Sequence, residues 1–237
     1  MSVKKAKRPA ASSRAKPDGA SAAERRRARA LLAALEAAYP DAHCELNYSA
    51  PHELLVATIL SAQCTDIAVN KATPALFAAF PTPEAFARAT PEKIEPYIRS
   101  LGFFRSKARA IHESMGVIVR EHGGRVPETM DELLRLRGVA RKTANVVLGN
   151  AFGINEGVVV DTHVGRLAVR FGLADAGDSV KKVEARLMSL FPREKWTLLS
   201  HLLIFHGRRA CTARTKRCEH PICERFGALC PGRENVG

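Results

Sequence analysis

The stretch from Leu136 to Asp161, which reads LRGVARKTANVVLGNAFGINEGVVVD, constrains the fold of this chain more than any other feature. It opens with a tight turn, where Gly138 lets the backbone bend sharply and approach another surface closely. A helix is predicted to start at Arg141, with apolar residues at helical spacing and Gly153 at its end. A helix that begins at such a turn points free N–H groups and the positive end of its dipole outward. That arrangement suits a phosphate group.

Helices are predicted along the rest of the chain, and strand patterning is nearly absent. Ser21 and Glu24 form a capping-box pattern ahead of the first helix, and Asp66 is expected to cap a later one. Pro74 is expected to interrupt that later helix, and Gly207 to stop one near the end of the chain. The other predicted helices start near 52, 82, 90, 106, 130, 162, 180 and 196. Together these segments predict an all-α chain of about ten helices.

The net charge of +13 points to a polyanionic partner, although most of that charge lies near the N-terminus. Residues 1–30 hold ten lysines and arginines against two acids, which leaves only +5 for the rest of the chain. The motifs must therefore identify the partner. No run reaches the ~18 apolar residues of a membrane span, and no secretory signal is visible, so we expect no membrane partner. Residues 1–24 are predicted to form a disordered basic tail.

Four of the six cysteines lie close together near the C-terminus. Cys211, Cys218, Cys223 and Cys230 follow the spacing C-x6-C-x4-C-x6-C. Four thiolates in so short a segment predict one metal cluster, and free thiols of this kind indicate a reducing cytoplasm. Zinc is the alternative, although zinc sites usually contain C-x2-C pairs and this segment has none. The two cysteines outside the segment, Cys44 and Cys64, are expected to be buried, inert thiols.

The segments LRGVARKTAN and VDTH resemble the helix–hairpin–helix of the endonuclease III family of DNA glycosylases, whose usual form is LPGVGRKTAN followed by VDTH. Arg137 replaces the usual proline, and Ala140 replaces the second glycine. The resemblance, which spans roughly residues 25–230, implies a two-lobed all-α fold. A six-helix barrel would comprise residues 44–154, and residues 25–43 would join 155–237 in a lobe that carries a 4Fe–4S cluster. The family's cysteine spacing is usually C-x6-C-x2-C-x5-C.

By this resemblance Lys142 and Asp161 are the catalytic residues. Lys142 would attack the sugar carbon as a neutral amine and form a Schiff base, which leads to strand cleavage by β-elimination. The helix N-terminus, the neighbouring Arg141 and partial burial are expected to favour the neutral amine. On its spacing alone, Lys142 would equally suit phosphate binding. Asp161 is a good helix cap that could also stabilise positive charge on the sugar, and His163 beside it is expected to be structural.

The resemblance also implies several contacts with DNA. Gln63 lies in a segment similar to the family's LSAQ-x-TD and would fill the space left by a flipped nucleotide, although a polar residue can also simply end a helix. Phe103 aligns with a wedge residue that separates bases, with a core position as the alternative. The hairpin residues expected to hold the DNA backbone are Arg137, Gly138, Val139, Ala140, Arg141 and Thr143.

The implied activity is that of a bifunctional DNA glycosylase and abasic-site lyase that removes oxidised or ring-saturated pyrimidines from duplex DNA. One alternative is a narrower mismatch or adenine glycosylase or a lyase alone. The other is a non-catalytic protein that binds damaged DNA. We expect a cytoplasmic monomer whose partner is double-stranded DNA with a damaged base or an abasic site. The basic tail would either add DNA affinity or keep the protein soluble.

Overall fold

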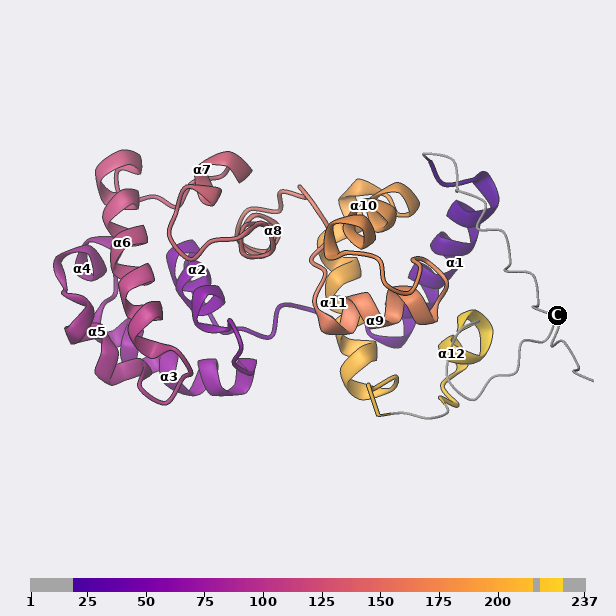
Figure 1. The fold of residues 1–237 in the computed structure, drawn as a ribbon, viewed down its shortest axis with the longest axis horizontal. Helices are drawn as coiled ribbons and strands as arrows, with labels where there is room; N and C mark the ends of the chain where they lie inside the picture. The colour runs from indigo at the N-terminus through magenta and orange to yellow at the C-terminus, as the bar shows by residue number, and fades with distance from the viewer. Residues whose placement is uncertain (1–18, 215–217, 228–237) are drawn as a thin grey trace, which may run out of the picture.

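The computed structural model describes residues 19–214 and 218–227, so most of the predicted tail and Cys230 lie outside the described residues. All regular structure in these two ranges is helical, as predicted (Figure 1). The elements are α1 (Ala22–Ala38), α2 (Pro51–Leu60), α3 (Asp66–Ala79), α4 (Pro83–Arg88), α5 (Pro91–Ile98), α6 (Phe104–His122), α7 (Met130–Leu134), α8 (Arg141–Ala151), α9 (Thr162–Arg170), α10 (Val180–Leu190), the 3-10 turn η1 (Arg193–Lys195), α11 (Trp196–Arg209) and α12 (Pro221–Phe226).

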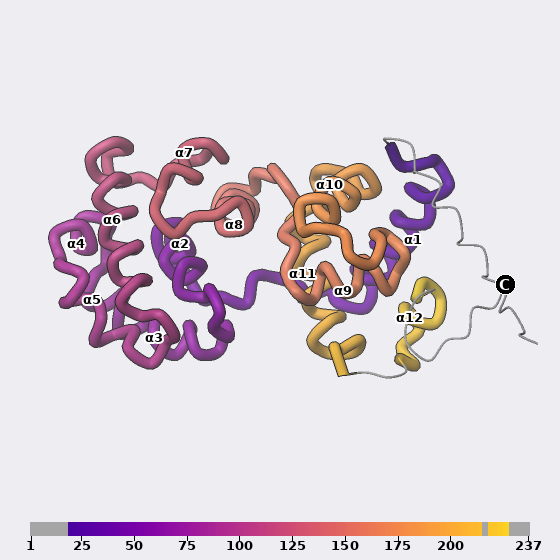
Figure 2. Tube along the Cα trace, in the orientation of Figure 1, coloured from indigo at the N-terminus to yellow at the C-terminus, as the bar shows by residue number. Residues whose placement is uncertain are grey.

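Two separate hydrophobic cores divide these helices into two lobes. The first core is built from residues between Leu46 and Leu148, so α2 to α8 form one lobe. The second joins α1 to α9–α12, and Leu31 and Leu35 of α1 are fully buried in it. Figures 1 and 2 show the consequence: the N-terminal helix lies among the C-terminal helices, while the middle of the chain forms the other half. The predicted two-lobed arrangement is confirmed.

Several helix boundaries differ from the predictions. The Ser21 capping box is present, but α1 starts at Ala22, so the last residues of the predicted 1–24 tail are helical. Thr65, not Asp66, caps α3, because the Thr65 hydroxyl accepts the Ala68 N–H at 3.2 Å. The helix α3 also continues through Pro74. A proline removes one hydrogen bond, and the buried side chains on either side of it hold the helix together.

Gly207 does not stop α11, which runs on to Arg209. Its role is spatial: a Cβ atom at this position would lie 3.0 Å from the Cβ and Nδ1 atoms of His163 on α9. A glycine therefore allows α9 and α11 to approach closely, since any larger side chain would push the two helices apart. The prediction of a helix end at Gly207 is wrong because glycine serves packing here, not termination.

Helix α8 joins the two lobes. Its apolar face packs in the first core, while Arg141 and Asn145 on another face reach Glu184 of α10. Arg141 Nε donates to both Glu184 carboxylate oxygens at 3.0 Å, and Asn145 Nδ2 donates to Oε1 at 3.1 Å. Gly157 lies against this group, where a Cβ atom would come within 2.1 Å of Glu184 Oε1.

Two further polar contacts link the lobes. At the C-terminal end of α8, the side chains of Asn150 and His201 hydrogen-bond at 2.7 Å. Burial, with His43 as a second cause, lowers the pKa of His201 to about 4, so this ring is neutral at pH 7. At the far end of α11, Arg208 pairs with Asp66 at 2.7 Å and also with Glu45. The lobes are thus held in register by hydrogen bonds at three places.

Replacing Glu184 with alanine should lower the free energy of unfolding by about 2 kcal/mol, because Asn145 would be left buried without its acceptor. Urea denaturation followed by circular dichroism measures this change. The matched control is Arg135→Ala, which breaks an exposed ion pair with Glu121 and should change stability by less than about 1 kcal/mol. Equal effects from the two substitutions would show that the Glu184 contact does not hold the lobes together.

Candidate functional site

Asp161 caps helix α9, as predicted. Its Oδ1 atom accepts the backbone N–H groups of His163 and Val164, both at 2.8 Å, and the side chain is half-buried. The carboxylate therefore sits at the positive end of the α9 dipole, in a fixed orientation. Directly before it, Val158 and Val160 are buried in the second core, which anchors the backbone of this corner.

Lys142 is the second residue of α8 and is exposed, so the predicted partial burial is wrong. The reason is the helical register, which turns Ala144, Val147 and Leu148 inward and leaves position 142 outside. The expected repulsion from Arg141 is also weakened, because the Arg141 guanidinium is paired with Glu184. What remains of the predicted environment is the position of Lys142 in the first turn of a helix.

The turn before α8 has the predicted geometry. Gly138 adopts a φ of +79°, and a Cβ there would lie 3.0 Å from that of Ala110 on α6, so this site requires glycine. Ala140 takes the N-cap position of α8 and offers no side-chain acceptor to its first-turn N–H groups. Those groups are therefore not capped by a side chain, which is the state required for binding a phosphate.

The other hairpin residues differ in exposure. Val139 is buried and anchors the turn, while Ala140 is exposed and Thr143 half-buried. Arg137 is exposed, but its guanidinium pairs with Glu113 of α6 at 2.5 Å. The charge predicted for phosphate contact is thus partly engaged within the protein.

Gln63 and Phe103 are both exposed, and both adopt left-handed backbone conformations, with φ of 56° and 59°. The exposed fraction of Phe103 is 67%, which excludes the alternative of a core position. The next residue, Phe104, is the one that packs against the first core. Cys64, which follows Gln63, is half-buried, and so is Cys44, so the burial predicted for these two thiols is only partial.

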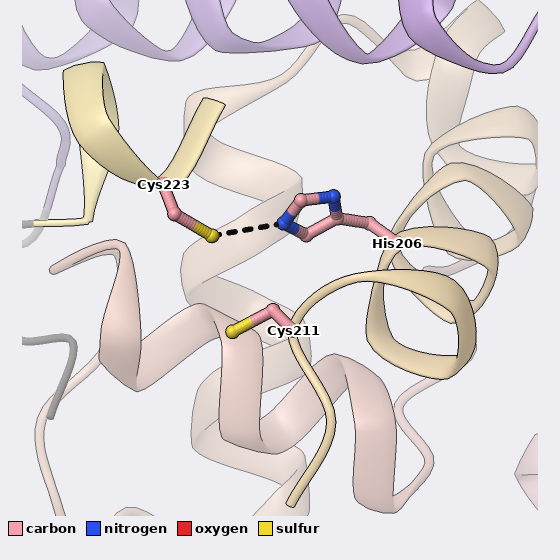
Figure 3. A group of neighbouring side chains, drawn as sticks. All are labelled: His206, Cys211 and Cys223. Atoms are coloured by element: carbon pink, nitrogen blue, oxygen red, sulfur yellow. Dashed lines mark hydrogen bonds between the residues drawn. The ribbon is translucent and has the colours of Figure 1, made fainter. Parts of the chain in front are cut away.

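Three of the four predicted metal ligands are among the described residues, and all three are buried: Cys211, Cys218 and Cys223. The ligand atoms of Cys211, Cys223 and His206 lie within 4.8 Å of one another, and Figure 3 shows their side chains converging. Hydrogen bonding to Cys211, then burial and a further bond to Cys218, raises the pKa of the Cys223 thiol. The sulfurs of Cys211 and Cys223 thus share one small space with His206, and Cys218 interacts with Cys223.

His206 is a member of this group that the sequence analysis missed. Its Nε2 atom lies 3.1 Å from Cys223 Sγ, and its Nδ1 atom 2.8 Å from the Tyr39 hydroxyl. Burial, with His220 as a second cause, lowers the pKa of His206 to about 4, so the ring is neutral. Arg170 of α9 donates to Cys211 Sγ at 2.8 Å. A histidine five residues before the first cysteine was the one available signal in the sequence.

A hollow of about 840 Å³ lies between the lobes, away from these residues. It is lined by the two segments that connect the lobes, the end of α8, η1 and α11, including His43, Asn150 and His201. Neither Lys142 nor Asp161 lines it. The candidate catalytic residues instead lie at the starts of α8 and α9. Asp161 directly follows the connection from Phe152 to Val160, whereas Lys142 lies at the opposite end of α8 from that connection.

Comparison with known proteins identifies this arrangement. Residues 56–193 match the family described as "HhH-GPD superfamily base excision DNA repair protein". Endonuclease III of Synechocystis sp. is 50% identical over 213 residues, which cover 90% of this chain and 95% of that protein. A solved non-covalent endonuclease III–DNA complex has a TM-score of 0.80 at 43% identity, covering 84% of this chain and 94% of its own. A trapped endonuclease III–DNA covalent intermediate has a TM-score of 0.77 at 44% identity, covering 81% and 89%.

The fold therefore belongs to the class of helix–hairpin–helix base excision repair proteins. Within that class, the chain belongs to the endonuclease III family. No helix among the described residues is long and apolar enough to cross a membrane.

Proposed function

We propose that this protein is a DNA glycosylase and abasic-site lyase that acts in base excision repair on oxidised or ring-saturated pyrimidines in duplex DNA. The observation that carries the proposal is that both Lys142 and Asp161 are present, one in each of the family's two motifs. Lys142 is an exposed amine in the first turn of α8, and Asp161 is a fixed carboxylate at the start of α9. Two related solved structures are an endonuclease III–DNA complex and a covalent endonuclease III–DNA intermediate.

In the proposed reaction, Lys142 Nζ forms a bond to the sugar carbon C1′ while the bond from C1′ to the damaged base breaks. The base leaves with the electron pair and takes up a proton. Loss of a proton from nitrogen and opening of the sugar ring give an iminium ion, which acidifies the C2′ proton. Removal of that proton expels the 3′-phosphate and breaks the strand. Asp161 would stabilise the positive charge on the sugar and accept the proton from the lysine ammonium.

The proposed DNA contacts follow from the same surface. First-turn N–H groups of α8 without a side-chain cap would bind a phosphate, with Gly138 allowing close approach of the backbone. Gln63 and Phe103 would enter the base stack from two neighbouring exposed loops, because flipping a nucleotide leaves a gap that must be filled. Exposure of both side chains supports this role.

A 4Fe–4S cluster is the proposed occupant of the cysteine group. The described residues fit it: Cys211, Cys218 and Cys223 are buried, Cys218 interacts with Cys223, and His206 Nε2 and Arg170 Nη1 face the sulfurs of Cys223 and Cys211. Cys211, Cys218, Cys223 and Cys230 would be the ligands. Bound there, the cluster would cross-link the end of α11 to α12, a segment with little apolar core of its own.

The remaining proposals concern organisation. We place the lobe boundaries near residues 44 and 154, where the two hydrophobic cores separate. A DNA substrate and free thiols together support a cytoplasmic, DNA-associated protein, which we propose to be a monomer. The adenine-specific alternative is disfavoured because the motif position is occupied by Lys142, and the non-catalytic alternative because Asp161 is also present.

Lys142→Gln should abolish covalent trapping by borohydride on an abasic duplex while DNA binding remains, because glutamine keeps the polarity of the side chain but cannot form an imine. The measurement is denaturing electrophoresis of the reduced adduct, with binding followed by fluorescence anisotropy. Lys181→Gln is the matched control, since Lys181 is likewise an exposed lysine at the second position of a helix. An unchanged adduct yield in Lys142→Gln would reject Lys142 as the nucleophile.

Asp161→Asn should leave the fold intact, because asparagine is an equally good helix cap, yet base removal should fall by about a hundredfold or more. Cleavage of a ready-made abasic site should suffer less, since the aldehyde is already electrophilic. Single-turnover rates on the two substrates separate these effects. Equal and small losses on both would leave Asp161 with the capping role alone.

Anaerobically purified protein should contain iron and acid-labile sulfide, about four of each per chain. Cys223→Ser should lose part of this content and destabilise the second lobe, which thermal unfolding would record. Cys44→Ser, outside the group, should change neither. One zinc per chain with no sulfide would contradict the assignment of the cluster.

A further inference from the structure

Two residues have an unusual backbone conformation. Among the described residues other than glycine, only Gln63 and Phe103 have positive φ, and neither belongs to the residue types that tolerate this region well. Such strain persists only where the surrounding structure enforces it, and it concentrates at functional sites. These are also the two residues proposed to enter the DNA stack.

One residue, Lys107, follows Phe103 on α6 and reaches the loop that carries Gln63. Lys107 on α6 is buried, with 5% of its surface exposed. Its Nζ atom donates to the carbonyl oxygen of Leu60 at 2.8 Å and to Cys64 Sγ at 3.1 Å, so it binds the chain on both sides of Gln63. Its backbone N–H donates to the carbonyl oxygen of Phe103 at 3.0 Å. That last bond is the first backbone bond of α6 and does not depend on the side chain, so the Lys107 side chain ties the Gln63 loop to the helix whose N-cap is Phe103.

The electrostatics indicate why a lysine occupies this position. No carboxylate among the described residues forms an ion pair with Lys107, so its ammonium is buried without an opposite charge. Leu60 is the last residue of α2, and its carbonyl lies at the negative end of that helix, which offsets part of the burial cost. A methionine of similar length would fill the space without any such cost. What the ammonium adds, compared with a methionine, is therefore its two hydrogen bonds to the Leu60 carbonyl oxygen and Cys64 Sγ.

We propose that Lys107 is a positioning residue whose side chain fixes Gln63 in its left-handed conformation close to the start of α6, ready to enter the base stack as a nucleotide rotates out. This inference rests on the DNA-inserting roles proposed above. Because Lys107 is buried, it acts through the Gln63 loop and not on the DNA. Holding this loop in place before binding lowers the ordering cost of the complex.

Lys107→Met tests the proposal. On a duplex with a damaged pyrimidine, the single-turnover rate should fall between about tenfold and a hundredfold, as expected when positioning is lost. The fluorescence of a 2-aminopurine placed opposite the damage should rise less on binding, since fewer complexes have the nucleotide turned out. Borohydride trapping on an abasic site in a single strand should change less than about twofold, because no base stack has to be opened there.

Two variants serve as controls. Arg109→Met removes an exposed charge from the same helix and should change none of the three readings. Cys64→Ala removes only one of the two Nζ contacts and keeps the buried ammonium bound to Leu60, so it should fold even if Lys107→Met does not. It should show a smaller loss on the damaged duplex in the same direction, with single-strand trapping unchanged.

The outcomes distinguish the inference from the function on which it rests. If Lys107→Met lowers trapping on the single strand as much as activity on the duplex, or if it changes neither, Lys107 is not a positioning residue. If Gln63→Ala and Phe103→Ala leave the 2-aminopurine signal unchanged, the proposed insertion itself is wrong. Loss of signal in those two variants with none in Lys107→Met or Cys64→Ala would overturn this inference alone.

Discussion

The contact between helix α8 and Glu184 is the interaction on which the candidate active site depends. The two lobes have separate hydrophobic cores, so burial of apolar surface alone does not fix how they face each other. Glu184 of the second lobe binds Arg141 and Asn145, which lie on either side of Lys142 on α8. A carboxylate that accepts from two donors a turn apart fixes both the rotation and the tilt of that helix. The direction of the Lys142 side chain follows from it.

The second lobe makes the matching contribution through α9. Asp161 caps the start of this helix, while Arg166 and Arg170 further along it donate to the carbonyl oxygen and the sulfur of Cys211. The same short helix thus runs from the candidate carboxylate to the cysteine group. Order in the cysteine segment would therefore hold α9, and with it Asp161, in place. This is a structural contribution and needs no change in oxidation state.

Local signals in the sequence predicted much of this structure. The Ser21 capping box, the positive φ of Gly138 and the cap at Asp161 each depend on a few neighbouring residues, so a motif suffices to find them. Glu184 and Lys107 could not be found in this way, because their partners lie about 40 residues away in the chain. The predicted helix breaks at Gly207 and Pro74 were wrong for a related reason, because contacts with residues distant in the chain override the local tendency of glycine and proline to end a helix. Packing against His163, for example, decides the role of Gly207.

Peptide mapping of the borohydride-reduced protein–DNA adduct tests the central claim most directly. The adduct is digested with protease and nuclease, and mass spectrometry locates the residue that carries the reduced sugar fragment. We expect the modification on Lys142, because it is the exposed amine in the first turn of α8 after the hairpin. A modification on any other amine, with Lys142 recovered intact, would contradict the account.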